Sequence, residues 1–160
     1  MGLIMLWRRP PLPSGLCDAW WAFVACAEVI EEGRRHLLAT LPTGRVEPVP
    51  VEVGLGAVSR AIDHARAGMW RWRLPELADV WSQCLAALET AAAAVPAAYQ
   101  VASAADELED LLGSVGAVVE PLVAFGDAER VWRRHWRVPT EGSSQPGRHL
   151  GPWPQVDEVI

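Results

Sequence analysis

The sequence contains no lysine and no asparagine among its 160 residues, so arginine supplies all 14 basic side chains. Lysine and asparagine codons are rich in A and T, and we interpret both absences as the codon bias of a GC-rich bacterial genome. The net charge is −6, which disfavours general nucleic-acid binding. We therefore expect a protein partner or a second copy of the chain rather than nucleic acid.

Cysteine is also scarce. The three residues, Cys17, Cys26 and Cys84, form no Cys-x-x-Cys pair, and this pattern is typical of reduced thiols rather than of a disulfide framework or a zinc site. The apolar start is followed by arginines instead of being preceded by them, unlike a secretory signal. No run approaches the roughly 20 apolar residues of a membrane span. We expect a cytoplasmic protein without a membrane span.

Catalytic motifs are missing as well. The chain has no Gly-x-Ser-x-Gly, no P-loop and no dinucleotide fingerprint. It also lacks the Glu-x-x-His pairs of di-iron bundles. Glu28, Glu32 and His36 share one helical face and could offer metal ligands, but a solvated polar face is the preferred explanation. We predict no catalytic residues, no metal site and no cofactor, and keep a small helical enzyme or metal protein as an alternative.

Helical periodicity is the strongest feature that is present. Between residues 55 and 72, apolar side chains recur at alternating steps of three and four: Leu55, Val58, Ile62, Ala65, Met69 and Trp72. A matching stripe runs through residues 77–95, and Pro75 suits the first turn of that second helix. Two apolar stripes of similar length joined by a short turn predict an antiparallel helical hairpin.

The segments around this hairpin are predicted from prolines and spacing. One helix should run from residue 15 or 16 to Leu41. Residues 42–53 hold three prolines and predict an extended connector, with a short edge strand as the alternative. A last helical region begins between Pro96 and Ser103, and Pro96 either breaks or kinks the chain. Pro121 predicts a kink near Ala117, and Gly126–Asp127 is a second place where two helices could separate.

We therefore expect an all-α fold, a bundle of four or five helices around a central antiparallel helical hairpin. Residues 1–15 are rich in proline and predict an irregular N-terminal arm. Residues 16–138 form a single helical domain, which the chain length permits. Residues 139–160 are rich in glycine, proline and serine and predict a disordered tail.

Charge is unevenly distributed along the chain. Ten acidic residues and no arginine lie between Glu76 and Glu129, whereas arginines dominate residues 60–73 and 130–137. Two interpretations stay open: the basic stretches pair with acidic neighbours inside the bundle, or an acidic face recruits a basic partner. Exposed ion pairs each contribute only about 0–1 kcal/mol, so stability is a weak reason for such segregation.

Tryptophan offers a second indication of binding, since nine are present and two lie at the hairpin turn. The leading hypothesis is a non-enzymatic interaction protein, an adaptor, assembly subunit or small regulator. Its predicted partner-binding residues are Trp70, Trp72, Asp106, Glu107, Glu109 and Asp110. The alternative for the two tryptophans is that they close the end of the bundle against the first helix or the N-terminal arm.

The segment 130–137, RVWRRHWR, alternates arginine with aromatic residues. This composition could bind nucleic acid through Arg130, Arg133, Arg134 and Arg137, with stacking on the indoles. A simpler interpretation is an amphipathic helix that docks its tryptophans on the bundle, since Trp132 and Trp136 are four residues apart. A nucleic-acid-associated accessory factor is therefore the second hypothesis for function.

Overall fold

The computed structural model describes residues 9–43, 48–104 and 107–139. It confirms the all-α prediction, with no strand among these residues. The main helices are α1 (Cys17–Ala39), α2 (Pro48–Gly68), α3 (Ala78–Ala104), α4 (Leu108–Val119) and α5 (Ala124–His135). Short 3-10 turns are η1 (Ser14–Leu16), η2 (Met69–Trp72), η3 (Pro75–Leu77) and η4 (Glu120–Val123). The predicted tail lies outside the described residues beyond Pro139.

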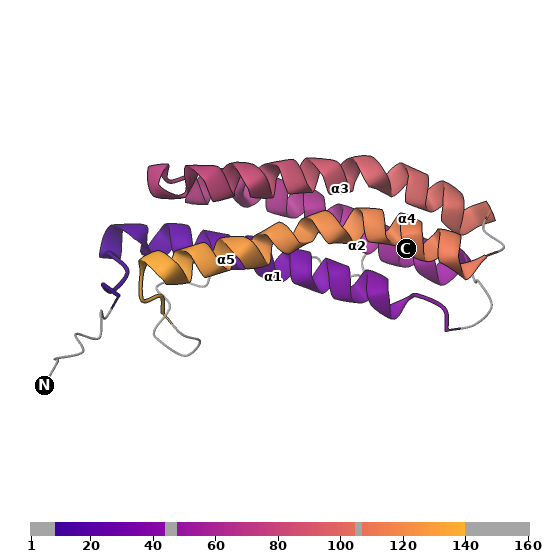
Figure 1. The fold of residues 1–160 in the computed structure, drawn as a ribbon, viewed down its shortest axis with the longest axis horizontal. Coiled ribbons are helices and arrows are strands. Elements are labelled where there is room, and N and C mark those ends of the chain that lie inside the picture. Colours follow the sequence, from indigo (N-terminus) through magenta and orange to yellow (C-terminus); the bar gives the residue numbers. More distant parts are fainter. Residues whose placement is uncertain (1–8, 44–47, 105–106, 140–160) are drawn as a thin grey trace, which may run out of the picture.

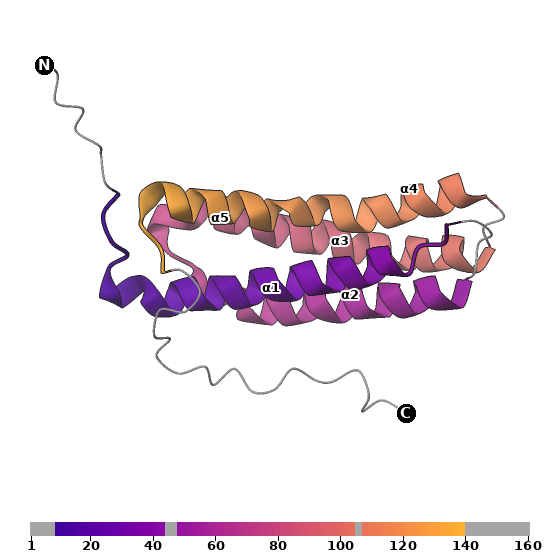
Figure 2. The ribbon, with the colours of Figure 1, turned by 90° about the horizontal axis from the view of Figure 1, so that it is seen from below.

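The helices form an antiparallel bundle of four rods, because α4, η4 and α5 follow one another along a single line (Figure 1). The rods run alternately up and down, so the α2–α3 turn lies at the same end as the start of α1 and the end of α5 (Figure 2). We call this end the hairpin end. The opposite end holds the start of α2 and the start of α4.

The central hairpin packs as its two stripes predict. Each member of the stripe from Leu55 to Trp72 is buried, and so are Leu77, Cys84 and Val95 on the facing stripe. All of them belong to one hydrophobic core that also takes in α1 and α5. Burying one such aliphatic side chain contributes about 1.5–3 kcal/mol, so this shared core holds the four rods together.

Helices α1 and α2 approach each other through glycine. A Cβ built on Gly33 would lie 2.6 Å from the Cβ of Ala61 and 3.3 Å from the Cα of Val58. A Cβ on Gly54 would lie 3.0 Å from the Cα of Leu37. A Cβ contact of 2.6 Å essentially never occurs, and contacts of 3.0–3.3 Å are tighter than most, so the absence of a side chain at these positions permits the close approach of the two helices.

The prediction that residues 42–53 form an extended connector is wrong from residue 48 onward, because α2 already begins at Pro48. Its prolines lie in the first turn of the helix. The N–H groups of that turn have no intrahelical partner, so proline removes no hydrogen bond there. The proline content that argued against a strand therefore marks a helix start, and Val51 extends the buried stripe by one turn.

Pro96 does not break the chain, because α3 continues through it to Ala104, as the continuous-helix alternative allows. The predicted helix start between Pro96 and Ser103 is wrong, since the next helix, α4, begins at Leu108. Alanines surround the proline on both sides, and their high helix propensity favours continuation of the helix. The last region divides at η4, which contains Pro121, and not at Gly126, which lies inside α5. The missing N–H of proline at the first positions of η4 explains this location.

Candidate protein-binding site at the hairpin end

The turn between α2 and α3 separates its two tryptophans. Trp72 has no exposed surface, and its ring packs edge-on against Phe23 of α1 with centroids 5.1 Å apart. Met69 is buried beside it in the same short 3-10 helix, η2. Trp72 therefore belongs to the core, and its predicted partner-binding role is wrong. The alternative prediction, that it closes the bundle against the first helix, describes its position.

Trp70 points the other way and is 70% exposed, the most exposed large apolar side chain in the described part of the protein. The guanidinium of Arg71 lies 5.5 Å from the centroid of its ring. The indole N–H of Trp81 donates a 2.7 Å hydrogen bond to the carbonyl of Met69, and Arg73 stacks 4.9 Å above the Trp81 ring. We call Trp70, Arg71, Arg73 and Trp81 the hairpin patch.

The hairpin patch contains two positively charged side chains. Arg71 and Arg73 are exposed and take part in no ion pair with another described residue. Neither these two arginines nor Trp81 are among the partner-binding residues predicted from the sequence. The alternation Trp-Arg-Trp-Arg at residues 70–73 was the available signal. A short turn of 3-10 helix cannot bury both tryptophans and both arginines, so some of these side chains must be exposed.

The C-terminal arginines of α5 lie at the same end of the bundle (Figure 2). Arg130 pairs with Asp127, and Arg133 pairs with Glu129 at 2.7 Å. Arg134 is exposed and forms no ion pair within the described residues. The end of α5 is also where positive charge favours the negative pole of the helix dipole, so these arginines have a local structural role as well.

The aromatic residues of α5 do not form a stacking platform. Trp132 is fully buried, with its ring centroid 5.4 Å from that of Trp20 and 5.9 Å from that of Phe23. Trp136 is half-buried against Trp132, at 5.3 Å. The nucleic-acid alternative needs an accessible base-stacking surface on this segment. Helix α5 instead docks its tryptophans on α1, as the simpler interpretation of the sequence predicts.

The chain also closes this end through its backbone. Arg137 donates a 2.8 Å hydrogen bond to the carbonyl of Pro10 and accepts one from the N–H of Leu12 at 3.2 Å. This parallel bridge attaches the described part of the predicted irregular arm to the end of α5. The guanidinium of Arg137 itself is exposed and forms no ion pair within the described residues.

Three of the four predicted acidic partner-binding residues lie at the opposite end of the bundle from the α2–α3 turn (Figure 1). Glu107, Glu109 and Asp110 are exposed at the start of α4, while Asp106 lies outside the described residues. Negative charge there stabilises the positive pole of the helix dipole. Leu112, one turn further, is 45% exposed. The structure thus separates the predicted partner-binding residues into two groups, one at each end.

The interpretation that acidic helices pair with basic neighbours across the bundle is wrong for the described residues. Each of their five arginine ion pairs joins positions three or four apart in one helix. No described arginine pairs with an acidic residue of another helix. The segregated charge is therefore displayed on the surface.

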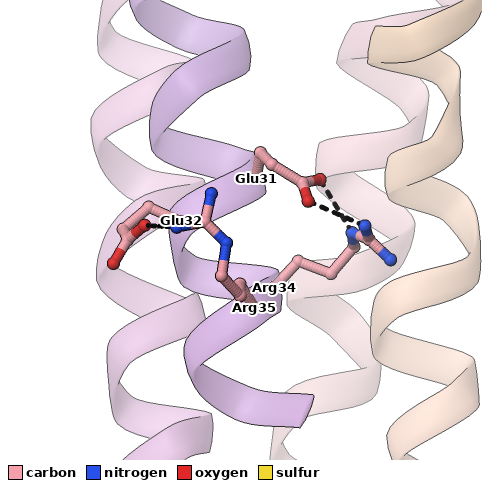
Figure 3. A network of polar contacts seen from close by, with 4 residues as sticks. All are labelled: Glu31, Glu32, Arg34 and Arg35. Atoms are coloured by element: carbon pink, nitrogen blue, oxygen red, sulfur yellow. Dashed lines mark hydrogen bonds and ion pairs between the residues drawn. The ribbon is translucent and has the colours of Figure 1, made fainter. Parts of the chain in front are cut away.

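The candidate metal ligands on α1 do not form a metal site in the described part of the protein. Glu32 accepts a 2.6 Å hydrogen bond from Arg35, and the neighbouring Glu31 binds Arg34 through two hydrogen bonds (Figure 3). The Arg34 guanidinium lowers the pKa of the Glu31 carboxyl below its usual value. Glu28 is exposed and His36 half-buried, and no group of three potential ligands lies close together among the described residues.

The two core thiols are buried and hydrogen-bonded. The Cys26 thiol lies 3.6 Å from the carbonyl of Ala65, and the Cys84 thiol 3.5 Å from that of Ala124. Burial raises the pKa of Cys26 to about 11 and that of Cys84 to about 12. Because the thiolate is the reactive form, neither group suits nucleophilic chemistry near neutral pH.

Two helical stretches, Pro75–Ala104 and Leu108–His135, are long and apolar enough to cross a membrane by length and composition. The core helices of soluble proteins share this property, so it is weak evidence for a membrane location. Comparisons of the chain with protein-family models, with curated proteins and with solved structures found no match. The function is therefore argued from the site itself.

Proposed function

We propose that the protein is a non-enzymatic interaction protein that binds an acidic segment of a protein partner through the hairpin patch. The observation that carries this proposal is the 70% exposure of Trp70 on a bundle that buries Trp72, two positions away, completely. Large aromatic side chains are enriched among the residues that dominate binding energy. A well-packed core next to an exposed indole therefore favours an intermolecular role for Trp70.

The arginines define the kind of partner. Arg71 lies against the Trp70 indole and Arg73 stacks on Trp81, so a partner bound over this patch must accommodate two guanidinium groups that form no ion pair with a described residue. Carboxylates meet this need, because arginine binds them through paired hydrogen bonds and complementary charge speeds encounter. The hydrogen bond from Trp81 to the Met69 carbonyl fixes this member of the patch, so its ring offers a rigid surface.

The test is affinity capture from host lysate with wild type and two single variants. Trp70→Ala removes the exposed indole, and Val123→Ala removes a 63% exposed valine from η4 as a matched control. Circular dichroism first establishes that both variants keep the helical fold. We expect wild type and Val123→Ala to retain the same partner, and Trp70→Ala to lose it. Retention of every captured protein by Trp70→Ala would contradict the proposal.

A further inference from the structure

The two ends of the bundle carry complementary surfaces. The hairpin patch presents the exposed Trp70 together with Arg71 and Arg73, which form no ion pair with a described residue. The opposite end presents Glu107, Glu109 and Asp110, which form no ion pair within the described residues, next to the 45% exposed Leu112. We call these four residues the acidic patch. Each patch therefore combines an exposed apolar side chain with charge of one sign.

More apolar surface lies at the end that holds the acidic patch. Val49 and Val53, one turn apart near the start of α2, are 67% and 51% exposed. Helix α2 starts at the same end of the bundle as α4 (Figure 2). This end therefore exposes apolar side chains on both α2 and α4. The surface here supplies both features that the hairpin patch requires of a partner.

Contact between two identical hairpin patches is disfavoured. Such a symmetric contact would place Arg71 and Arg73 of both copies together, and like charges across an interface are unfavourable. The same argument applies to two acidic patches. The favourable pairing between two copies is heterologous, with the hairpin patch of one against the acidic patch of the next.

We propose that the partner of the hairpin patch is the acidic patch of a second copy of this chain, so that the bundles associate head to tail. This inference rests on the proposed function and names its partner. In each contact the indole of Trp70 lies against Leu112 of the next copy, and the two arginines face Glu109 and Asp110. Because the two patches lie at opposite ends, each added copy leaves both ends of the chain of bundles open.

The test uses two variants that each inactivate one end. Trp70→Ala removes the apolar anchor of the hairpin patch and leaves the acidic patch intact. The double variant Glu109→Gln/Asp110→Asn removes charge from the acidic patch with little change in shape. Glu89→Gln, at an exposed acidic position in the middle of α3, is the control for lost negative charge. Circular dichroism establishes folding, and sedimentation velocity measures mass against protein concentration at low and high salt.

We expect wild type and Glu89→Gln to grow past the dimer with concentration at low salt, and to dissociate as salt screens the charges. Each end variant alone should associate at least about tenfold more weakly, the effect of losing a dominant contact. An equimolar mixture of the two end variants retains one working contact, so it should form a dimer and stop. This capped dimer distinguishes head-to-tail assembly from symmetric pairing.

A wild type that stays monomeric at every concentration would overturn head-to-tail assembly, and so would a mixture of end variants that stays monomeric. If capture of a different acidic protein still depends on Trp70, the proposed function stands and only its partner is wrong. If no protein is retained in a Trp70-dependent way either, both proposals fall.

Discussion

The contact between α1 and α2 allows a sharp prediction about Gly33. An added methyl group would lie 2.6 Å from the Cβ of Ala61 and 3.3 Å from the Cα of Val58, so the helix backbones must move apart. Alanine gains about 1 kcal/mol over glycine in a helix interior. Overpacking of a tight contact costs about 1–3 kcal/mol, and the backbone contact places this site at the upper end. We expect Gly33→Ala to lower the free energy of unfolding by about 1–2 kcal/mol.

Gly113 in α4 is the matched control, because a Cβ there would meet no atom within 4 Å. Gly113→Ala should raise stability by about 0.5–1 kcal/mol from helix propensity alone. Urea unfolding followed by circular dichroism measures both changes. The thermal midpoint should fall by about 2–4 °C per kcal/mol lost in Gly33→Ala.

A double variant identifies the contact responsible. Ala61→Gly removes the nearest atom, so Gly33→Ala should cost at least about 0.5 kcal/mol less in that background than in wild type. The reasoning is refuted if Gly33→Ala stabilises the protein as Gly113→Ala does. It is also refuted if the cost of Gly33→Ala is the same with and without the methyl group of Ala61.

Further predictions concern the turn and the thiols. In urea unfolding, Trp72→Ala should lose about 3–5 kcal/mol because it empties a core site, whereas Trp70→Ala should change stability by less than about 0.5 kcal/mol. In the native protein a thiol reagent should modify the half-buried Cys17 but reach Cys26 and Cys84 only after denaturation, as mass spectrometry of labelled peptides would report. Ionisation of these two thiols also predicts alkaline sensitivity. The pKa of each thiol is near 9 in the unfolded chain but about 11 for Cys26 and about 12 for Cys84 in the folded protein. Above pH 9 the unfolded chain therefore loses these protons while the folded protein still keeps them. The free energy of unfolding should therefore be unaffected by these thiols below pH 9. Above pH 9 it should fall by about 1.4 kcal/mol per pH unit for each thiol, until the pKa of that thiol in the folded protein is reached. Cys26→Ala should flatten this decline in urea unfolding at pH 8 to 10, and an unchanged slope would contradict the assignment.

The sequence predicts the central hairpin well because apolar residues recur at steps of three and four without interruption from Leu55 to Trp72. Periodicity reports which face is buried, and all of these side chains are in the core. Proline is harder to interpret from sequence. At Pro48 it begins a helix, and at Pro96 it lies inside one, so the residue type alone does not give its position relative to the first turn.

The binding residues are predicted only in part, for a geometric reason. Trp70 and Trp72 are the same residue type with an arginine after each, so the sequence does not distinguish them. The 3-10 turn η2 directs Trp72 into the core and Trp70 to solvent. Helical spacing of 3.6 residues does not describe so short a turn. The separation of Glu109 and Asp110 from Trp70 likewise depends on the up-and-down order of the rods. This order places the start of α4 and the α2–α3 turn at opposite ends of the bundle, and it is not evident from the sequence pattern.

Site-specific photo-crosslinking in the host cell can identify the molecules that contact the hairpin patch. A photoreactive benzophenone amino acid replaces Trp70 in one strain and the exposed Val123 in another. The account predicts discrete protein adducts, to another copy or to an acidic partner, from position 70 and few or none from position 123. Equal labelling from both positions, or no adduct from position 70, would contradict the claim that the hairpin patch is the binding surface.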